Sequence, residues 1–451
     1  QICSKLKPTY TMLFKSPNPN KDLGNLFINQ TLFVKHLLSK PFMYLIPRIS
    51  EMEPISTHEA FKYQWSIWRY TGMDPPKNSR LRILYFTHAA ILNTFITLMF
   101  PISLTVNCFF SSNLGELCSS LSITITDILC NLKLFNVVVK RKKLLEFKAI
   151  NKKLDRRANS KEERAILQSG IELSHKVFII FVILYGLTVF ASVLSVLLAN
   201  EFNLMFPAWM PLDWKNSKFS WILANGYQFL CLLIQGLQDC ANDTYPQAYL
   251  TILASHLKAL SFRLQNIAKD SKKSSAENYR ELIECIKDHQ EILRLNETIQ
   301  KIISSACFAQ FIGTGIGQCT TAVYYLQIDF ELARFATLIG FFSAVTLETY
   351  VLCHFGNVLM QESVQLTSAI CSCNWTNQSK EFKSALLFLI HRSQRINGIM
   401  AGGFIPVSMP IFVKVKNMNI FSFKYSQISY ISLQVMKTSY SFFAVLIRFR
   451  K

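Results

Sequence analysis

The sequence predicts an all-α membrane protein with seven transmembrane helices, a cytoplasmic N-terminus and long cytosolic helical extensions. Half of the 451 residues are hydrophobic and only 17% are charged, against roughly 25% in soluble domains. Apolar runs long enough to cross a bilayer, which takes about 20 residues, recur along the chain. The formal net charge of +20 gathers in alternate loops, which indicates basic cytoplasmic loops rather than nucleic-acid binding.

The N-terminal part divides into two predicted regions. Residues 1–51 mix Lys, Pro and Asn with isolated apolar clusters and show no clear period, so we expect a poorly ordered extension. A membrane domain with spans one to four is predicted over 52–247. Trp65 and Trp68 stand beside basic residues near its start, a composition that suits a re-entrant or interfacial helix.

Seven segments are predicted to cross the membrane. They are residues 83–109, 117–139, 177–199, 219–238, 302–328, 335–359 and 404–447. Lys and Arg crowd the connections after the second, fourth and sixth segments and are sparse in the alternate connections. Because basic residues concentrate on the cytoplasmic side, we expect the N-terminus inside and the C-terminus outside, the reverse of a G-protein-coupled receptor.

Two basic connections are predicted to fold as cytosolic helices. In residues 248–301, Leu250, Leu253 and Leu257 follow helical spacing, and a second amphipathic helix follows a polar break. Residues 360–398, after spans five and six (302–359), hold a third such helix. Each helix has one apolar stripe that needs a partner, so we expect a compact cytosolic bundle within or between subunits.

The outer halves of the spans carry the candidate ligand-binding residues. Their aromatic and small polar side chains suit the apolar walls and few polar anchors of a small-molecule pocket, although helix packing uses the same residue types. The candidates are Thr126, Tyr185, Thr188, Tyr227, Phe229, Phe341 and Phe342. Asp127 and Glu348 are carboxylates at membrane depth, which mark either a functional site or a local pairing. The outward loop 206–214, with two prolines and two tryptophans, is expected to form a lid.

Other chemistry finds little support in the sequence. Gly313-Thr-Gly-Ile-Gly317 lies in an apolar span with no strand before it, so it favours close helix approach over a dinucleotide site. Cys371-Ser-Cys373 near His391 falls short of four zinc ligands. Cys108 and Cys118 flank one loop and could pair, which spacing alone does not establish. We expect no enzyme, no catalytic or metal-binding residues and no cofactor.

The last apolar segment, 433–447, carries a polar stripe on one side of a helix of 3.6 residues per turn. Its candidate pore-lining residues are Gln434, Thr438, Ser441 and Val445. Such groups either bond to a neighbouring helix or line a water-filled pathway. Within the predicted last region, 399–451, residues 414–431 carry three lysines and interrupt the seventh span.

Three stretches resemble the insect odorant receptors: Trp68-Arg-Tyr-Thr-Gly-Met-Asp-Pro-Pro76, the 206–214 loop and Thr438-Ser-Tyr-Ser-Phe-Phe-Ala-Val-Leu446. The likeness covers residues 52–413 and 432–451. Family members usually begin after the equivalent of residues 1–51 and lack the insert 414–431.

The resemblance implies an odour-tuned subunit that joins a shared co-receptor in a hetero-tetrameric ligand-gated cation channel. It further implies a volatile ligand bound in the outer half of the bilayer among spans two to six, and a common pore lined by the last spans. The expected location is the plasma membrane of olfactory sensory neuron dendrites. The alternative is a metabotropic seven-helix chemoreceptor; a transporter is a third reading, without the repeated halves that would indicate one.

Overall fold

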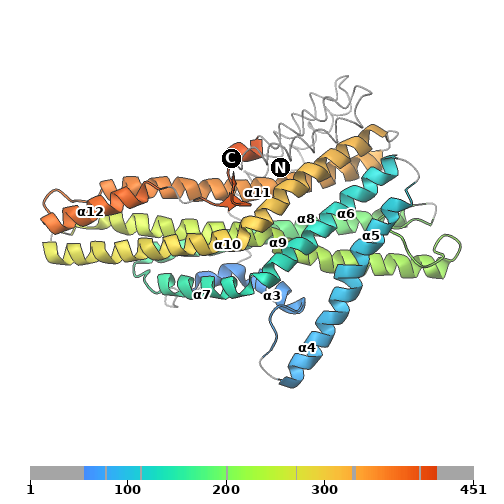
Figure 1. Cartoon of the computed structure of the whole chain (residues 1–451), viewed down its shortest axis with the longest axis horizontal. Helices are drawn as coiled ribbons and strands as arrows, with labels where there is room; N and C mark the ends of the chain where they lie inside the picture. Colours follow the sequence, from blue (N-terminus) through green and yellow to red (C-terminus); the bar gives the residue numbers. More distant parts are fainter. Residues whose placement is uncertain are drawn as a thin grey trace, which may run out of the picture.

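The computed structural model describes residues 55–76, 79–111, 114–199, 202–270, 272–327, 332–395 and 398–413. They form an elongated bundle of helices (Figure 1). The helices are η1 (Thr57–Phe61), α3 (Lys62–Tyr70), α4 (Ser79–Leu92), η2 (Asn93–Leu98), α5 (Met99–Phe109), α6 (Leu114–Val139), α7 (Arg141–Asp155), α8 (Lys161–Leu197), α9 (Lys218–Asn266), α10 (Ser275–Gln327), α11 (Leu332–Cys371) and α12 (Lys380–Ser393).

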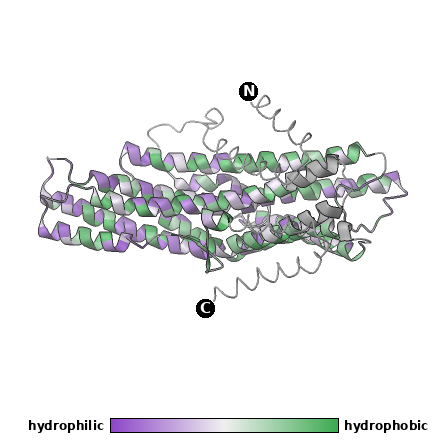
Figure 2. Ribbon diagram, turned by 90° about the horizontal axis from the view of Figure 1, so that it is seen from above, coloured by the Kyte–Doolittle hydropathy of each residue, from purple (hydrophilic) through white to green (hydrophobic). Residues whose placement is uncertain are grey.

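The two ends of the bundle differ in polarity. Hydrophilic residues gather over the end that carries α12, and apolar residues over the opposite end (Figure 2). Among the described residues, four helical stretches are long and apolar enough to cross a membrane: Leu81–Phe109, Ser120–Val139, Lys161–Leu197 and Ser275–Thr321. The prediction of a helical membrane protein is therefore confirmed, while the number of seven spans and their orientation stay predictions.

The first membrane stretch contains a π-helical turn, η2, between α4 and α5. A π-turn interrupts the regular helix ladder, and side chains of α9 bind its carbonyls. The Tyr227 hydroxyl donates to the Phe95 carbonyl at 2.7 Å, and Gln235 Nε2 donates to the Ile96 carbonyl at 3.3 Å. Helix α9 thereby fixes the wide turn against the bundle.

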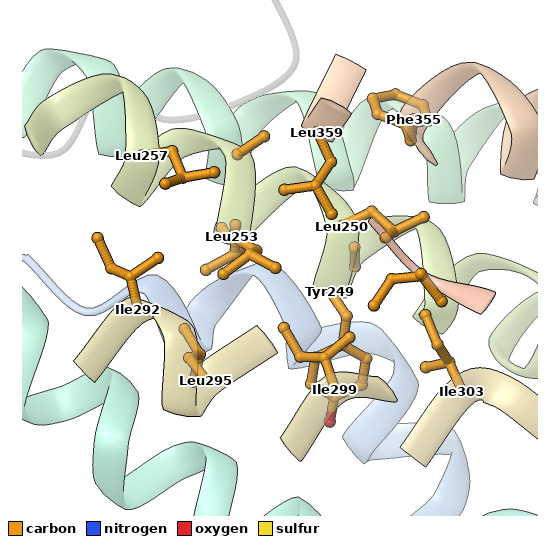
Figure 3. Packing of buried hydrophobic residues seen from close by; sticks show 14 of the residues in the cluster. Tyr249, Leu250, Leu253, Leu257, Ile292, Leu295, Ile299, Ile303, Phe355 and Leu359 are labelled. Carbon is orange, nitrogen blue, oxygen red and sulfur yellow. The ribbon is translucent and has the colours of Figure 1, made fainter. Parts of the chain in front are cut away.

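Helices α9 and α10 run unbroken for 49 and 53 residues. The amphipathic helix predicted after residue 248 therefore continues the helix that holds the predicted span 219–238 instead of starting a new helix. In this polar half, buried leucines and isoleucines of α9 and α10 meet side chains of α11 (Figure 3). The set comprises Leu250, Leu253 and Leu257 of α9, Ile292, Leu295 and Ile299 of α10, and Leu359 of α11.

The N-terminal elements are anchored in the same half by buried polar contacts. The backbone N–H and hydroxyl of Thr57 donate to the Asp155 carboxylate at 2.9 and 2.8 Å, Asn151 Nδ2 donates to the Thr57 hydroxyl, and His256 Nε2 bonds Asn151 Oδ1 at 2.9 Å. Burial raises the pKa of Asp155 to about 6, although the Thr57 bonds oppose the rise, and burial lowers the pKa of His256 to about 4.

Helix α3 packs against the bundle, and its position at the membrane interface stays a prediction. Trp68 is fully buried inside the protein: its ring meets the Tyr245 ring edge-on, and Nε1 donates to Asn242 Oδ1 at 3.3 Å. Helix α3 packs on α9 because it needs a partner for this large side chain. Cys108 and Cys118 are free thiols, so the pairing that their spacing left open is not formed.

The predicted start of the seventh span, at residue 404, is also corrected. Strands β1 (Met400–Ala401) and β2 (Ile405–Pro406) pair there as a short antiparallel hairpin. Gly402 and Gly403 adopt φ of 62° and 86°, which favours glycine and a turn rather than a helix. Gln300 Nε2 and the Ser304 hydroxyl of α10 hold the hairpin by donating to the Met400 carbonyl at 2.7 and 2.8 Å.

Candidate functional site

A cavity of about 750 Å³ opens between α6, α8, α9, α10 and α11 in the apolar half of the bundle. Its walls are mostly aliphatic and aromatic side chains, with hydroxyl groups on α6, α8, α10 and α11. Gly236 of α9 and Gly340 of α11 widen it, because a Cβ at either position would meet no heavy atom within 4 Å. The volume lies within the range of small-molecule pockets in proteins.

The loop before α9 closes one part of this cavity. Met205 and Phe206 line it, and their backbone N–H groups donate to the side chains of Asn225 and Gln228 of α9 at 3.1 and 3.2 Å. The Trp209 N–H donates to the Ser103 carbonyl of α5 at 3.1 Å. The loop predicted as a lid is thus fastened to α5 and α9 by its own backbone.

Five polar side chains from five helices form a connected network at another wall. Lys133 Nζ of α6 donates to Asp243 Oδ1 of α9 and to Gln310 Oε1 of α10. The Tyr185 hydroxyl of α8 lies 2.6 Å from Asp243 Oδ2 and 2.7 Å from Glu348 Oε1 of α11. Gln310 Nε2 donates to Glu348 Oε2 at 2.8 Å. Buried charges are tolerated when they are paired and bonded in this way.

The structure gathers some of the predicted ligand-binding residues and separates others. Thr126, Tyr185 and Thr188 line the cavity. Tyr227 instead bonds η2 on another face of α9, and Phe229 is 37% exposed away from the lining. Phe342 is half-buried and outside the lining.

Five other candidates lie outside the described part of the chain. The side chain of Phe341 is one of them. The remaining four are the pore-lining candidates Gln434, Thr438, Ser441 and Val445.

Sequence reasoning missed three of the five members of the polar network, namely Lys133, Asp243 and Gln310. Glu348 and Asp127 were singled out as carboxylates at membrane depth, and both line the cavity. Lys133 and Asp243 were not, although a lysine at the centre of an apolar run was a usable signal for a buried partner. Gly313 of α10 meets α6, because a Cβ there would overlap Leu129 Cδ1, whereas a Cβ at Gly317 would meet no heavy atom within 4 Å. The close approach predicted for the two glycines is therefore found at Gly313 alone.

The comparisons with known proteins agree with this architecture. The profile of the family described as "7tm Odorant receptor" matches residues 113–420. Odorant receptor 2a of Drosophila melanogaster is 36% identical over 409 residues, covering 87% of this chain and 98% of the relative. Odorant receptor 19a of the same species is 29% identical over 365 residues, covering 80% and 94%.

Solved structures share the fold. The insect olfactory receptor OR5 from Machilis hrabei superposes with a TM-score of 0.68 at 13% identity, over 81% of this chain and 96% of that one. Its complex with eugenol gives a TM-score of 0.69, again at 13% identity, over 82% and 97%. These structures show the fold, while the family profile and the sequence relatives decide the family. The chain belongs to the insect odorant receptors, among the receptors themselves rather than the co-receptor, and thus to a family of receptors and not of enzymes.

Proposed function

We propose that this protein is the odour-binding subunit of a heteromeric ligand-gated cation channel, and that its cavity holds a volatile small molecule. The observation that carries the proposal is the cavity itself: about 750 Å³, mostly apolar, and closed in part by a fastened loop. A volatile molecule gains affinity chiefly by leaving water for apolar walls.

The proposal extends to the assembly and its location. A shared co-receptor completes the channel as a hetero-tetramer in the plasma membrane of olfactory sensory neuron dendrites. The last spans line the pore, with Gln434, Thr438, Ser441 and Val445 facing the ions. Family membership and the apolar helices support this assignment. A polar stripe in a membrane segment suits a water-filled path.

Whole-cell current tests the channel part of the proposal. Cells expressing this chain with the co-receptor should carry an odour-evoked cation current that persists when G-protein signalling is blocked. Cells expressing this chain alone should carry none. A current that disappears with the G-protein block would support a metabotropic receptor and overturn the proposal.

A matched pair of glycine variants tests the cavity part. Gly236 and Gly226 both lie on α9 with open space around a built Cβ, but only Gly236 lines the cavity. Gly236→Leu should place its side chain where the ligand binds. If the ligand loses contacts worth about two methylenes, near 0.8 kcal/mol each, half-maximal activation needs roughly tenfold more odorant. Gly226→Leu should leave the response unchanged, and equal responses from both variants at equal surface level would place the ligand elsewhere.

A further inference from the structure

Four hydroxyl groups of the cavity wall already donate their hydrogens to carbonyls of the protein. Thr188, Ser192 and Ser195 of α8 donate to carbonyls of their own helix at 2.7, 2.9 and 2.8 Å. Thr126 of α6 donates to the Ser122 carbonyl at 2.9 Å. A hydroxyl has one hydrogen and two lone pairs. These four groups therefore offer a ligand oxygen lone pairs and no free hydrogen.

The deeper polar groups also donate most of their hydrogens to other groups of the protein. The one hydrogen of Tyr185 lies between two carboxylates, and the Gln310 amide donates to Glu348 at 2.8 Å and to Thr314 at 3.3 Å. Lys133 donates two of its three N–H groups to Asp243 and Gln310. Most donors facing the cavity are thus satisfied within the protein.

Asp127 adds a stronger acceptor to the same wall. It lines the cavity beside Thr126 and is 8% exposed. Its carboxylate accepts from Asn131 Nδ2 at a long 3.4 Å and from the side-chain amide of Gln235. Within the described residues it has no ion-pair partner. A carboxylate has about four acceptor positions, so Asp127 retains capacity for a donor supplied by a ligand.

We propose that this cavity selects volatile molecules that carry an O–H or N–H donor, namely alcohols, phenols and amines, over ethers and esters of the same size. The inference rests on the proposed function, because it concerns the ligand of that cavity. Beside these four hydroxyls and Asp127, an acceptor-only molecule would bring its oxygen against oxygens that have no hydrogen to give. A site built to bind a hydroxyl rejects the analogue that lacks it.

Isomeric ligand pairs test this selectivity in cells that also express the co-receptor. Hexan-1-ol and 1-methoxypentane share one molecular formula, as do 4-methylphenol and anisole, and further pairs of five to twelve carbons extend the panel. We expect the donor-bearing isomer to activate at about tenfold lower concentration, the preference that one or two net hydrogen bonds give. Equal potency within pairs, stronger ethers, or a panel in which no donor-bearing molecule acts would overturn the proposal.

Asp127→Asn identifies the accepting group, because it keeps the shape and supplies an N–H donor. The potency ratio between the donor-bearing isomer and its ether should fall below about threefold, chiefly because the ether oxygen can accept from the new N–H donor and gains potency. Asp213→Asn is the control, since Asp213 is exposed in the outer loop and bonds Asn216 outside the cavity. If Asp127→Asn fails to reach the surface, Thr188→Val takes its place and should weaken alcohols alone.

The results also separate this inference from the proposed function. Unchanged pair ratios in a variant at normal surface level would refute the role of Asp127. If Gly236→Leu still weakens every ligand while the pair ratios are near one, the cavity binds odorants without selecting donors.

Discussion

Removing the cation from the polar network should destabilise the whole bundle. Lys133→Met leaves the carboxylate of Asp243, whose side chain is 4% exposed, without its counter-ion, and leaves the oxygen of Gln310 without its donor. Breaking a buried pair from one side costs about 3–5 kcal/mol. Fewer chains should therefore reach the surface, and the protein in detergent should lose its monodisperse peak at a lower temperature.

The double variant tests whether the pair itself is responsible. Lys133→Met with Asp243→Leu removes both charges, and Tyr185 still has Glu348 at 2.7 Å as an acceptor. Replacing both partners by apolar groups is often close to neutral, so we expect at least half of the lost stability to return. Lys142→Met, at an exposed position of α7, is the control and should match the wild type.

Two outcomes would refute this reasoning. One is a Lys133→Met protein as heat-resistant as the wild type. The other is a double variant whose loss equals the sum of the two single losses, because independent sites add while paired groups do not.

Two further predictions concern packing and pH. Gly356→Ala should lower the free energy of unfolding by about 1–3 kcal/mol, because a Cβ there would overlap the Val407 carbonyl oxygen. Gly226→Ala, in open space, should stabilise α9 by up to about 1 kcal/mol. Thermal midpoints of the two variants that move together would contradict the packing argument. The pKa of Asp155 is raised to about 6, so its contribution to stability grows as pH falls through 6. The pKa of His256 is lowered to about 4, so its contribution to stability is lost as pH falls below 6.5. The two contributions therefore oppose each other. Asp155→Asn should therefore make the loss between pH 6.5 and 5 steeper by roughly 1–2 kcal/mol; thermal profiles parallel to those of the wild type at each pH would contradict this.

The sequence predicted what depends on local composition. Apolar length and helical spacing located the helices, and the carboxylate of Glu348 was visible as an anomaly within a span. The prolines and tryptophans of the 206–214 loop indicated a structured segment, whose backbone is indeed fastened to α5 and α9.

Pairing across the bundle could not be predicted in this way. Lys133 and Asp243 are 110 positions apart, and no periodicity shows which helices are neighbours. Tyr227 is an aromatic residue of the kind expected in a pocket, but its position around the axis of α9 directs its side chain to η2. Which face of a helix meets a cavity depends on the angle at which the helices pack, and one sequence does not contain that angle.

The continuity of α9 has a mechanical consequence. The helix borders the cavity with Gly236 and Asp243, passes the buried Pro246, and continues to Asn266 in the polar half. Proline cannot donate to the carbonyl four residues earlier, so bending is easiest at that point. The twenty residues beyond it span about 30 Å at 1.5 Å each. A 5° bend at Pro246 would move the far end of α9 by about 2.6 Å. Because the helix is continuous, a small bend beside the cavity would become a larger displacement in the polar half of the bundle.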